Sequence, residues 1–475
     1  MKFKVQIVAG DGADVVVHEL AILEKECELV QQIGLTLAES KEILRELQKQ
    51  LVEHQAEAFV HARAFCGECG SKLRGKGRHA VVFRTLFGNV PLDSPRLRHC
   101  ACSTHDTASF SPLADLFPER SAPELRFMEA KWASLVSYGM TAKALQDFLP
   151  VDDAMNASTV RNHTLAVAQR CEAKLGEEQF AFVEGCPNDW NALPPAEGPI
   201  TVGIDGGYLR HWTEKKTNFE VIVGKSVPTE GAAKCFGFVQ SYDEKPKRRL
   251  YDVLSSQGMQ MNQDVFFMSD GEKTVRDLQR YLNPRAKHVL DWFHITMRIT
   301  VLGQFLKGLR HAKLPEDAAP LTVTGLVDEM ERALESTKWN LWHGCPGRAL
   351  ESFSDIYPLS CNFAETYPKY KALEKLVREF QRYIENNRHM VINYGQRWRE
   401  GLVISTAFVE SLVNSLLGKR FTKKQQMQWT HRGAHLLLQT RTRVVNGELE
   451  ATFREWYPGM KAANDAQPES LREAA

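Results

Sequence analysis

The stretch "TVGIDGGYLRHW", residues 201–212, decides the fold that we predict, because an apolar run ends on Asp205 and two glycines follow it. A buried carboxylate without a partner costs on the order of several kcal/mol. A turn is the simplest explanation, since Asp and Gly are common where strands stop. The alternative is that the charge of Asp205 has a partner, which another part of the chain must supply.

A second stretch, "VFFMSDGEKTV", repeats this arrangement, with an apolar run that ends on Asp270. Two aspartates at the ends of adjacent strands face each other, and their repulsion raises one pKa or requires a cation. A divalent metal ion accepts hard oxygen ligands from both carboxylates. For either aspartate alone, a strand-ending turn is the simpler reading.

A third acid, Glu410, lies at the margin of the apolar stripe of the helix expected in "GLVISTAFVESLVNSLLGKRFTKK". Taken singly, it reads as a solvated helix charge. Taken with Asp205 and Asp270, it predicts a two-metal site that acts on a phosphodiester. A basic run follows directly and is expected to neutralise DNA backbone phosphates; it comprises Lys419, Arg420, Lys423 and Lys424.

The stretch "VLDWFHI" carries Asp291 and His294, which share a face if a helix begins here. Asp291 then holds His294 near the metal site, or His294 touches the scissile phosphate. The equally good alternative is that Asp291 caps the helix and His294 is an ordinary core histidine.

Four cysteines are spaced as metal ligands, in the pairs "CGEC" (Cys66 and Cys69) and "CAC" (Cys100 and Cys102). Two strand-like runs separate the pairs, so we predict a zinc ribbon over residues 64–108 that needs Zn²⁺ to fold. His99 and His105 are rival fourth ligands, and a chance group of thiols is the alternative. Basic residues flank the ribbon and either contact DNA or form a solvated face; they are Arg74, Lys76, Arg78 and Arg84.

Within residues 109–183, the stretch 121–176 reads as three helices, of which the second is short and the third begins with polar turns. This order matches a helix-turn-helix, in which the start of the last helix reads base edges. A plain helical hairpin fits as well. The residues expected to contact DNA are Ser158, Thr159, Arg161, Asn162 and His163.

Composition limits the other classes of function. The chain has 475 residues, 43% of them hydrophobic and 25% charged, which predicts a folded protein of two to four domains. The net charge of +1 means that any affinity for nucleic acid must come from local basic patches. Without a membrane-length apolar stretch or a signal peptide, we expect a cytoplasmic protein.

The fold class expected is multidomain α+β, with a mixed α/β core that is interrupted by helices. The expected parts follow in chain order: residues 1–63 form an N-terminal strand and amphipathic helical region, 64–108 the zinc ribbon, 109–183 the helix-turn-helix region, 184–199 a linker, 200–300 and 400–457 the two parts of the catalytic core, 301–399 a helical insertion and 458–475 a flexible tail.

Together, "GIDGGY", "SDGE", "DWFH" and "VESLVNSLLGKRFTKKQQMQW" resemble the DDE transposases of bacterial insertion sequences, in particular the ISKra-like group related to the Mutator-like elements. The resemblance implies a ribonuclease-H-like core with an all-helical insertion before the catalytic glutamate. It makes Asp205, Asp270 and Glu410 the catalytic acids, which hold Mg²⁺ or Mn²⁺, and Asp291 with His294 the D-x-x-H signature.

The same resemblance implies a DNA transposase that binds double-stranded terminal inverted repeats, joins them to target DNA and acts as a homodimer on DNA in the bacterial nucleoid. No ATP is expected, because the sequence has no GxxxxGK[ST] loop. Three other functions are considered: a domesticated, non-catalytic DNA-binding regulator, a nuclease on the same fold, and a zinc hydrolase that uses His294. The last fits poorly because no HExxH-like pair is present.

Overall fold

The structure is a computed structural model that describes residues 1–460 except 10–15, 27–28, 31–32, 103–106, 178–187, 215–216, 272–285, 311–319, 367–370 and 423–426. It divides into two compact units. Unit 1 is Met1–Arg170 with Arg443–Ala475, and unit 2 is Cys171–Thr442. The chain is thus multidomain and mixes helices with strands, as the sequence predicts.

Unit 1 begins with an antiparallel hairpin of β1 (Lys2–Ala9) and β2 (Val16–Glu24), followed by the long helix α1 (Leu37–Ala62). Residues 1–63, for which the sequence predicts one strand and an amphipathic helical region, thus contain a second strand, and the helix begins only at Leu37. Residues 16–24 are extended because they pair with β1 and include the β-branched residues Val16, Val17 and Ile22, which favour strands. A capping box between Thr36 and Glu39 fixes the start of α1.

The predicted ribbon contains two antiparallel strands, β3 (Gly75–Thr85) and β4 (Gly88–Arg98), with the short strand β5 (Ser109–Phe110) beside β4. Helix α2 (Pro112–Leu116) follows. One face of β4 packs on α1, and α2 completes this core, whose buried residues are Val52, Ala56, Val90, Leu92 and Leu113. The cysteine-bearing loops therefore lie at the end of a hairpin that is held by a hydrophobic core.

Three helices follow, α3 (Pro123–Leu135), α4 (Tyr138–Phe148) and α5 (Ala157–Lys174), in the order that the sequence predicts. Their shared core contains Ala133, Ala142 and Val160. Helix α16 (Leu449–Trp456) also packs on α3, where Phe127 and Phe453 lie edge to face with ring centroids 5.4 Å apart. Residues 443–457 thus belong to unit 1, whereas the sequence prediction assigned them to the second part of the catalytic core.

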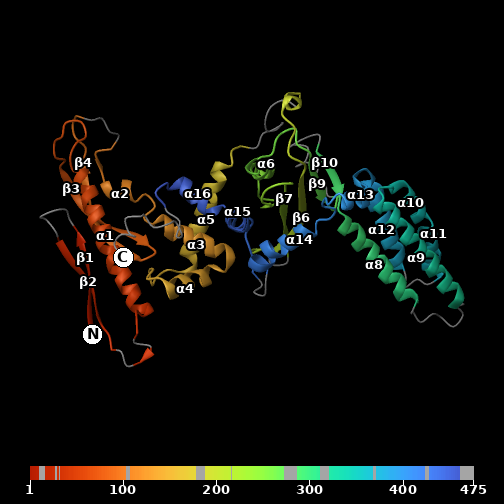
Figure 1. The fold of residues 1–475 in the computed structure, drawn as a ribbon, viewed down its shortest axis with the longest axis horizontal. Helices are drawn as coiled ribbons and strands as arrows, with labels where there is room; N and C mark the ends of the chain where they lie inside the picture. Colours follow the sequence, from red (N-terminus) through yellow and green to blue (C-terminus); the bar gives the residue numbers. More distant parts are fainter. Residues whose placement is uncertain are drawn as a thin grey trace. The chain divides into compact units, whose positions relative to one another are not determined.

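Unit 2 is built on a five-stranded sheet with the strand order β10-β9-β6-β7-β8. The strands are β6 (Ile200–Arg210), β7 (Asn218–Val227), β8 (Lys234–Val239), β9 (Val265–Ser269) and β10 (Lys287–Leu290). The first three pair antiparallel, whereas β9 is parallel to β6 and β10 is parallel to β9. Figure 1 shows these strands side by side in green.

Strand β6 corrects the prediction from its sequence. It does not end at Asp205 but continues to Arg210, paired with β7 along its whole length. Its pairing with β9, in contrast, stops at Gly203. At Asp205, β6 is therefore still paired with β7 but no longer with β9. The Asp205 carboxylate lies beside the end of β9, although β6 itself makes no turn there.

Helices cover both faces of the sheet. Helix α6 (Pro246–Ser256) packs on the face that contains Ile200, Val202 and Ile204. On the other face, α14 (Ala407–Val413) lies so close to β6 that a Cβ at Gly203 would be 2.4 Å from a methyl group of Val409. Glycine is required there for the helix to approach the strand.

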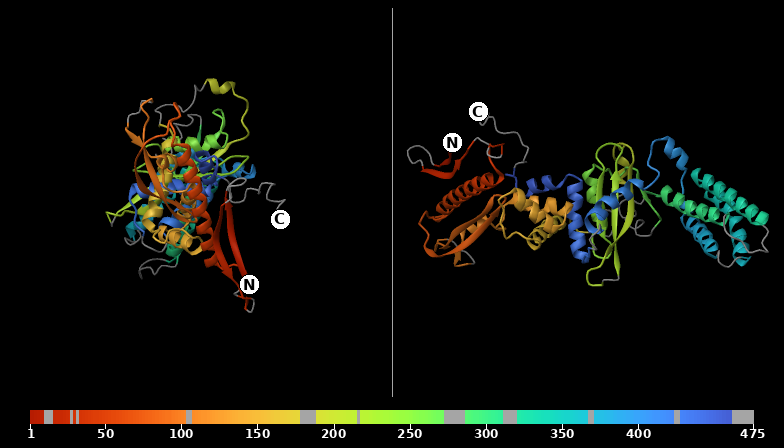
Figure 2. Two further views of the ribbon diagram at one scale, coloured as in Figure 1. Left: turned by 90° about the vertical axis from the view of Figure 1, so that its left-hand side faces the viewer. Right: turned by 90° about the horizontal axis from the view of Figure 1, so that it is seen from below.

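The predicted helical insertion begins earlier than residue 301, because α8 spans Trp292–Arg310. It continues with α9 (Pro320–Trp342), α10 (Pro346–Ser354), α11 (Ile356–Thr366), α12 (Lys371–Asn387) and α13 (Tyr394–Arg399). Figures 1 and 2 show this bundle beginning at the β10 edge of the sheet. In the part of the chain that is described, no helix is long and apolar enough to cross a membrane.

Candidate functional site

The parallel strands bring three aspartates into one row. The last β6–β9 pair is Gly203 with Met268, and the last β9–β10 pair is Ser269 with Leu290. The same register, carried to the end of β9, puts Asp205 beside Asp270 and Asp270 beside Asp291. Neighbouring strands lie about 4.8 Å apart, and residues in register point to the same face. We call Asp205, Asp270 and Asp291 the aspartate row.

Electrostatics supports this geometry at Asp205, whose pKa is raised. Burial is the largest cause, and the charges of Asp270 and Asp291 raise the pKa further. Two groups act in the opposite direction and lower this pKa: the Gly206 N–H donates to Asp205 Oδ1 at 2.8 Å, and His294 interacts electrostatically with the carboxylate. A bound cation would relieve the remaining repulsion between the carboxylates, so the row fits a divalent metal ion.

Asp291 has a structural role in addition to its charge. Its side chain is fully buried, and Oδ1 accepts hydrogen bonds from the backbone N–H of Phe293 and of Thr406, both at 2.9 Å. Oδ2 accepts a hydrogen bond from the Thr406 hydroxyl and lies 3.6 Å from His294 Nε2. Asp291 therefore caps α8, as the alternative reading of its sequence expects, and also ties α8 to the start of α14.

Removing this tie is expected to destabilise unit 2. In Asp291→Ala, the buried N–H groups of Phe293 and Thr406 lose their acceptor, which should lower the free energy of unfolding by about 2–4 kcal/mol. Chemical denaturation measures this change. Thr406→Ser keeps both contacts and serves as the matched control, with an expected loss below about 1 kcal/mol. Equal stability of Asp291→Ala and the wild type would contradict the capping role.

Glu410 lies on α14, next to Val409, which packs on the sheet. Its side chain is exposed. Directly after α14, residues Asn414–Thr422 form a π-helix (η5), a rare geometry that is frequent at functional sites. Among the described residues, no set of three ligand-type side chains within 4.8 Å of one another includes Glu410, Asp205 or Asp270. The described residues therefore do not bring Glu410 into one ligand cluster with Asp205 and Asp270, although α14 covers the face of the sheet that carries Gly203 and Asp205.

The residues of the basic run after Glu410 differ in their exposure to solvent. Lys419 is exposed, but Arg420 is only 3% exposed and its guanidinium lies 5.4 Å from the ring centroid of Trp429. Arg420 therefore packs inside unit 2, which does not fit the predicted contact with a phosphate. Lys423 and Lys424 lie outside the described residues.

The four predicted zinc ligands come together in unit 1. Cys66 Sγ lies 3.3 Å from Cys102 Sγ, and Cys69 Sγ lies 3.5 Å from Cys100 Sγ. All four sulfur atoms are within 4.8 Å of one another and none forms a disulfide. Such a Cys₄ cluster could bind zinc in tetrahedral geometry. The β3–β4 hairpin separates the two cysteine pairs in sequence and folds them together in space.

The environment of the cluster favours a thiolate at Cys69. Hydrogen bonds with Ser71 and with the neighbouring cysteines lower the pKa of Cys69 to about 6, whereas the other thiols raise the pKa of Cys102. His99 is not part of the cluster, because its ring stacks on Phe110 with centroids 4.8 Å apart. The other rival ligand, His105, lies outside the described residues.

Most of the predicted DNA-contacting residues of α5 are accessible. Ser158, Arg161 and Asn162 are exposed and Thr159 is half-buried. His163 differs, because its Nδ1 forms a hydrogen bond with the fully buried carboxylate of Glu129 on α3. His163 thus joins two helices of unit 1. The basic residues of the ribbon are all exposed, namely Arg74, Lys76, Arg78 and Arg84.

Sequence reasoning missed a second charged cluster, which lies in unit 2. The buried guanidinium of Arg249 contacts both carboxylate oxygens of Glu172 at 2.8 Å and Asp243 at 2.9 Å. His435 Nε2 lies 3.2 Å from Glu172 Oε2. Glu172, Asp243 and His435 could hold a metal ion by distance alone. Because the Arg249 guanidinium already forms ion pairs and hydrogen bonds with both carboxylates, we assign the cluster to stability.

This cluster predicts a loss of stability in acid. Burial alone would raise the pKa of Glu172, but hydrogen bonds from His435 and Arg249 outweigh it and lower the pKa from 4.5 to about 2. The resulting stabilisation is complete above pH 4.5 and is lost as the pH falls towards 2; it amounts to at most about 3 kcal/mol. Urea midpoints between pH 5 and 3 measure it. Glu172→Gln should flatten this pH dependence, and an unchanged slope would contradict the assignment.

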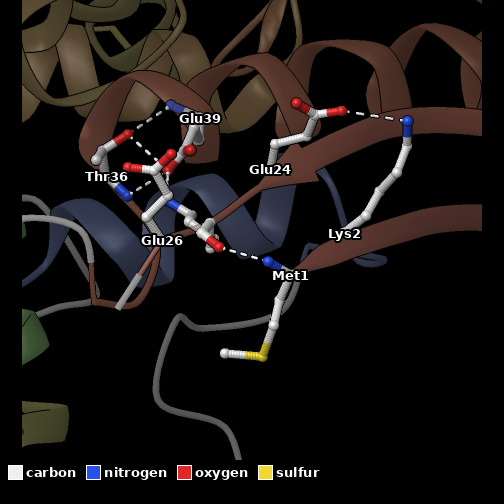
Figure 3. Close-up of a pocket in the computed structure, with 7 residues that line it drawn as sticks. Met1, Lys2, Glu24, Glu26, Thr36 and Glu39 are labelled. Atoms are coloured by element: carbon white, nitrogen blue, oxygen red, sulfur yellow. Dashed lines mark hydrogen bonds and ion pairs between the residues drawn. The ribbon is translucent and has the colours of Figure 1, made fainter. Parts of the chain in front are cut away.

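A cavity of about 510 Å³ opens at the N-terminus of unit 1 (Figure 3). Its groups pair with one another: the Met1 amino group donates to the Lys25 carbonyl at 2.6 Å, and Lys25 Nζ donates to Glu39 at 2.6 Å. The hydrogen bond of Glu39 with Lys25 and those with Thr36 lower the pKa of Glu39 to about 2. These contacts fasten the hairpin to the start of α1.

No protein-family model matches this sequence, and a search of curated proteins also finds no match. Function must therefore be argued from the sites themselves.

Proposed function

We propose that this protein is a DDE-type DNA transposase, which cleaves the ends of a DNA element and joins them to target DNA. The observation that carries the proposal is the aspartate row, in which the register of the parallel strands sets Asp205 beside Asp270, and burial together with repulsion from the neighbouring carboxylates raises the pKa of Asp205. Carboxylates held at this spacing are suited to hard divalent cations.

The topology of unit 2 also supports a ribonuclease-H-like core. Three consecutive antiparallel strands are followed by two parallel ones on the β9 side of the sheet. The helices α8–α13 then separate this first part from α14, which carries Glu410. A helical insertion before the third acid is the arrangement that the resemblance to DDE transposases implies.

Asp205, Asp270 and Glu410 would hold Mg²⁺ or Mn²⁺. When bound, such ions lower the pKa of water for attack and stabilise charge on the leaving oxygen of a phosphodiester. The chain itself contributes orientation: the Gly206 N–H fixes one oxygen of Asp205, and Asp291 holds the start of α14 in place. The imidazole of His294 interacts electrostatically with Asp205, so it is placed to donate a hydrogen bond to a phosphate there.

DNA recognition is assigned to unit 1. The exposed start of α5 would read base edges, with Ser158, Arg161 and Asn162 available, and the basic ribbon would contact phosphates. Zn²⁺ at the Cys₄ cluster would hold the ribbon loops together. In unit 2, Lys419 would neutralise a phosphate near Glu410. Two element ends must be joined, so a homodimer on DNA is part of the proposal.

A cleavage and joining assay tests the proposal. Purified protein is incubated with labelled duplexes from both boundaries of the DNA segment that encodes it, a target plasmid, and Mg²⁺ or EDTA. We expect Mg²⁺-dependent nicks at the boundary and labelled DNA joined to the plasmid. Binding without cleavage would contradict the proposal in favour of a regulator. Cleavage of unrelated duplexes without joining would contradict it in favour of a nuclease.

A further inference from the structure

The helical insertion reaches the aspartate row through the last turn of α12. The buried amide of Asn387 lies against the backbone of Gly271, the residue after Asp270, where a Cβ would be only 2.7 Å from Asn387 Oδ1. Gly271 also has a φ of +103°, a conformation that L side chains rarely adopt. The turn that presents Asp270 is therefore held directly by the insertion.

One turn earlier on α12, Tyr383 carries the contact to α8. Asn387 Nδ2 donates to the Tyr383 carbonyl at 2.9 Å, and the guanidinium of Arg298 lies 4.3 Å from the centre of the Tyr383 ring. This distance is within the range of a cation–π interaction. Arg298 follows His294 by four residues, so both lie on the same face of α8.

Tyr383 is within electrostatic range of the row. Burial raises its pKa, the charges of Asp270 and Asp291 raise it further, and Arg298 lowers it. Arg298 and the two aspartates therefore all interact electrostatically with the Tyr383 hydroxyl. Arg298 itself is exposed, so its donor groups are accessible to a ligand.

The row favours a cation beside it. A phosphodiester that approaches Asp205, Asp270 and Asp291 meets their negative charges, and an oriented cation, in addition to bound metal ions, would attract the phosphate and fix its position. An arginine fork matches two phosphate oxygens, and stacking on an aromatic ring reduces the entropy that it loses on binding.

We propose that Arg298, held by Tyr383, binds a phosphate of the DNA strand at the aspartate row, so that the helical insertion supplies the phosphate-binding side of the site. This inference deepens the proposed function and rests on it for the identity of the strand. Arg298 is the group that touches substrate, and Tyr383 is a positioning residue.

The test compares Arg298→Ala with Arg298→Lys, Tyr383→Phe and Tyr383→Ala. Lys307→Ala is the matched control, because Lys307 is also exposed on α8 but lies nine residues further on, on the opposite side of the helix. DNA affinity is measured by fluorescence anisotropy in Ca²⁺ at several salt concentrations. Single-turnover cleavage is measured in Mg²⁺, with and without added guanidinium.

We expect Arg298→Ala to bind DNA about tenfold more weakly and to lose about 0.9 from the slope of log affinity against log salt. Its cleavage rate should fall about 10–100-fold, and guanidinium or Arg298→Lys should restore part of it. Tyr383→Phe keeps the ring and should behave like the wild type, whereas Tyr383→Ala should resemble Arg298→Ala. Lys307→Ala should leave both measurements unchanged.

Arg298→Ala with the affinity, salt slope and cleavage rate of Lys307→Ala would overturn the inference. If the wild type does not cleave at all, the proposed function fails. The salt slopes still decide whether Arg298 binds a phosphate in that case, so the two failures are distinguishable.

Discussion

Asp205→Asn is expected to lower the rate of DNA cleavage by at least about 10³-fold while DNA affinity stays within about twofold. Asparagine keeps the size of the side chain and can still accept the hydrogen bond from the Gly206 N–H, so the local backbone should not change. What it removes is the negative charge that holds a divalent cation. Single-turnover cleavage of labelled duplexes in Mg²⁺ measures the effect.

Asp270→Asn and Glu410→Gln should have effects of the same order, because each removes one carboxylate from the proposed pair of metal sites. Asp252→Asn is a suitable control, since Asp252 is an exposed carboxylate on α6, the helix on the other face of the sheet. If any one of the three acid variants retains more than a tenth of the wild-type rate, that acid has been assigned wrongly.

Replacing Cys66 and Cys69 by serine is expected to abolish zinc binding and to unfold the ribbon. The apparent free energy of zinc binding in zinc-finger peptides is about 10–16 kcal/mol, which far exceeds the stability of so small a module. Zinc content should fall by one ion per chain. Hydrogen exchange over β3 and β4 should become fast, while exchange in unit 2 stays slow.

Cys345→Ser is the matched control for this double variant, because Cys345 is a half-exposed thiol of unit 2 outside the cluster. It should keep the full zinc content. Unchanged zinc in the double variant, or loss of zinc in Cys345→Ser, would rule out the Cys₄ cluster as the zinc site.

Local patterns in the sequence were enough to predict part of this structure. The pairs of cysteines bracket a β-hairpin, and hairpin pairing brings such pairs together whatever the surrounding fold. Asp270 follows a short apolar run, and a short strand does end there. In both cases the feature depends only on a strand and on its pairing with a neighbouring strand, and the local sequence pattern signals both.

The remaining features depend on residues that are distant in sequence. Strand β6 continues past Asp205 because β7 pairs with it, which the apolar pattern of β6 alone does not reveal. Arg249 meets Glu172 and Asp243 only after the sheet has formed, and no spacing in the sequence signals that contact. The burial of Arg420 likewise depends on Trp429, which follows the basic run.

The central claim is that Asp205, Asp270 and Glu410 hold divalent metal ions, and binding of Mn²⁺ tests it most directly. Electron paramagnetic resonance of zinc-loaded protein, titrated with Mn²⁺ in the presence of duplex DNA, counts the bound ions. The account predicts two Mn²⁺ per chain for the wild type and a loss of binding in Asp205→Asn, Asp270→Asn and Glu410→Gln, with Asp252→Asn unchanged. The same Mn²⁺ binding in the wild type and in all three acid variants would contradict it.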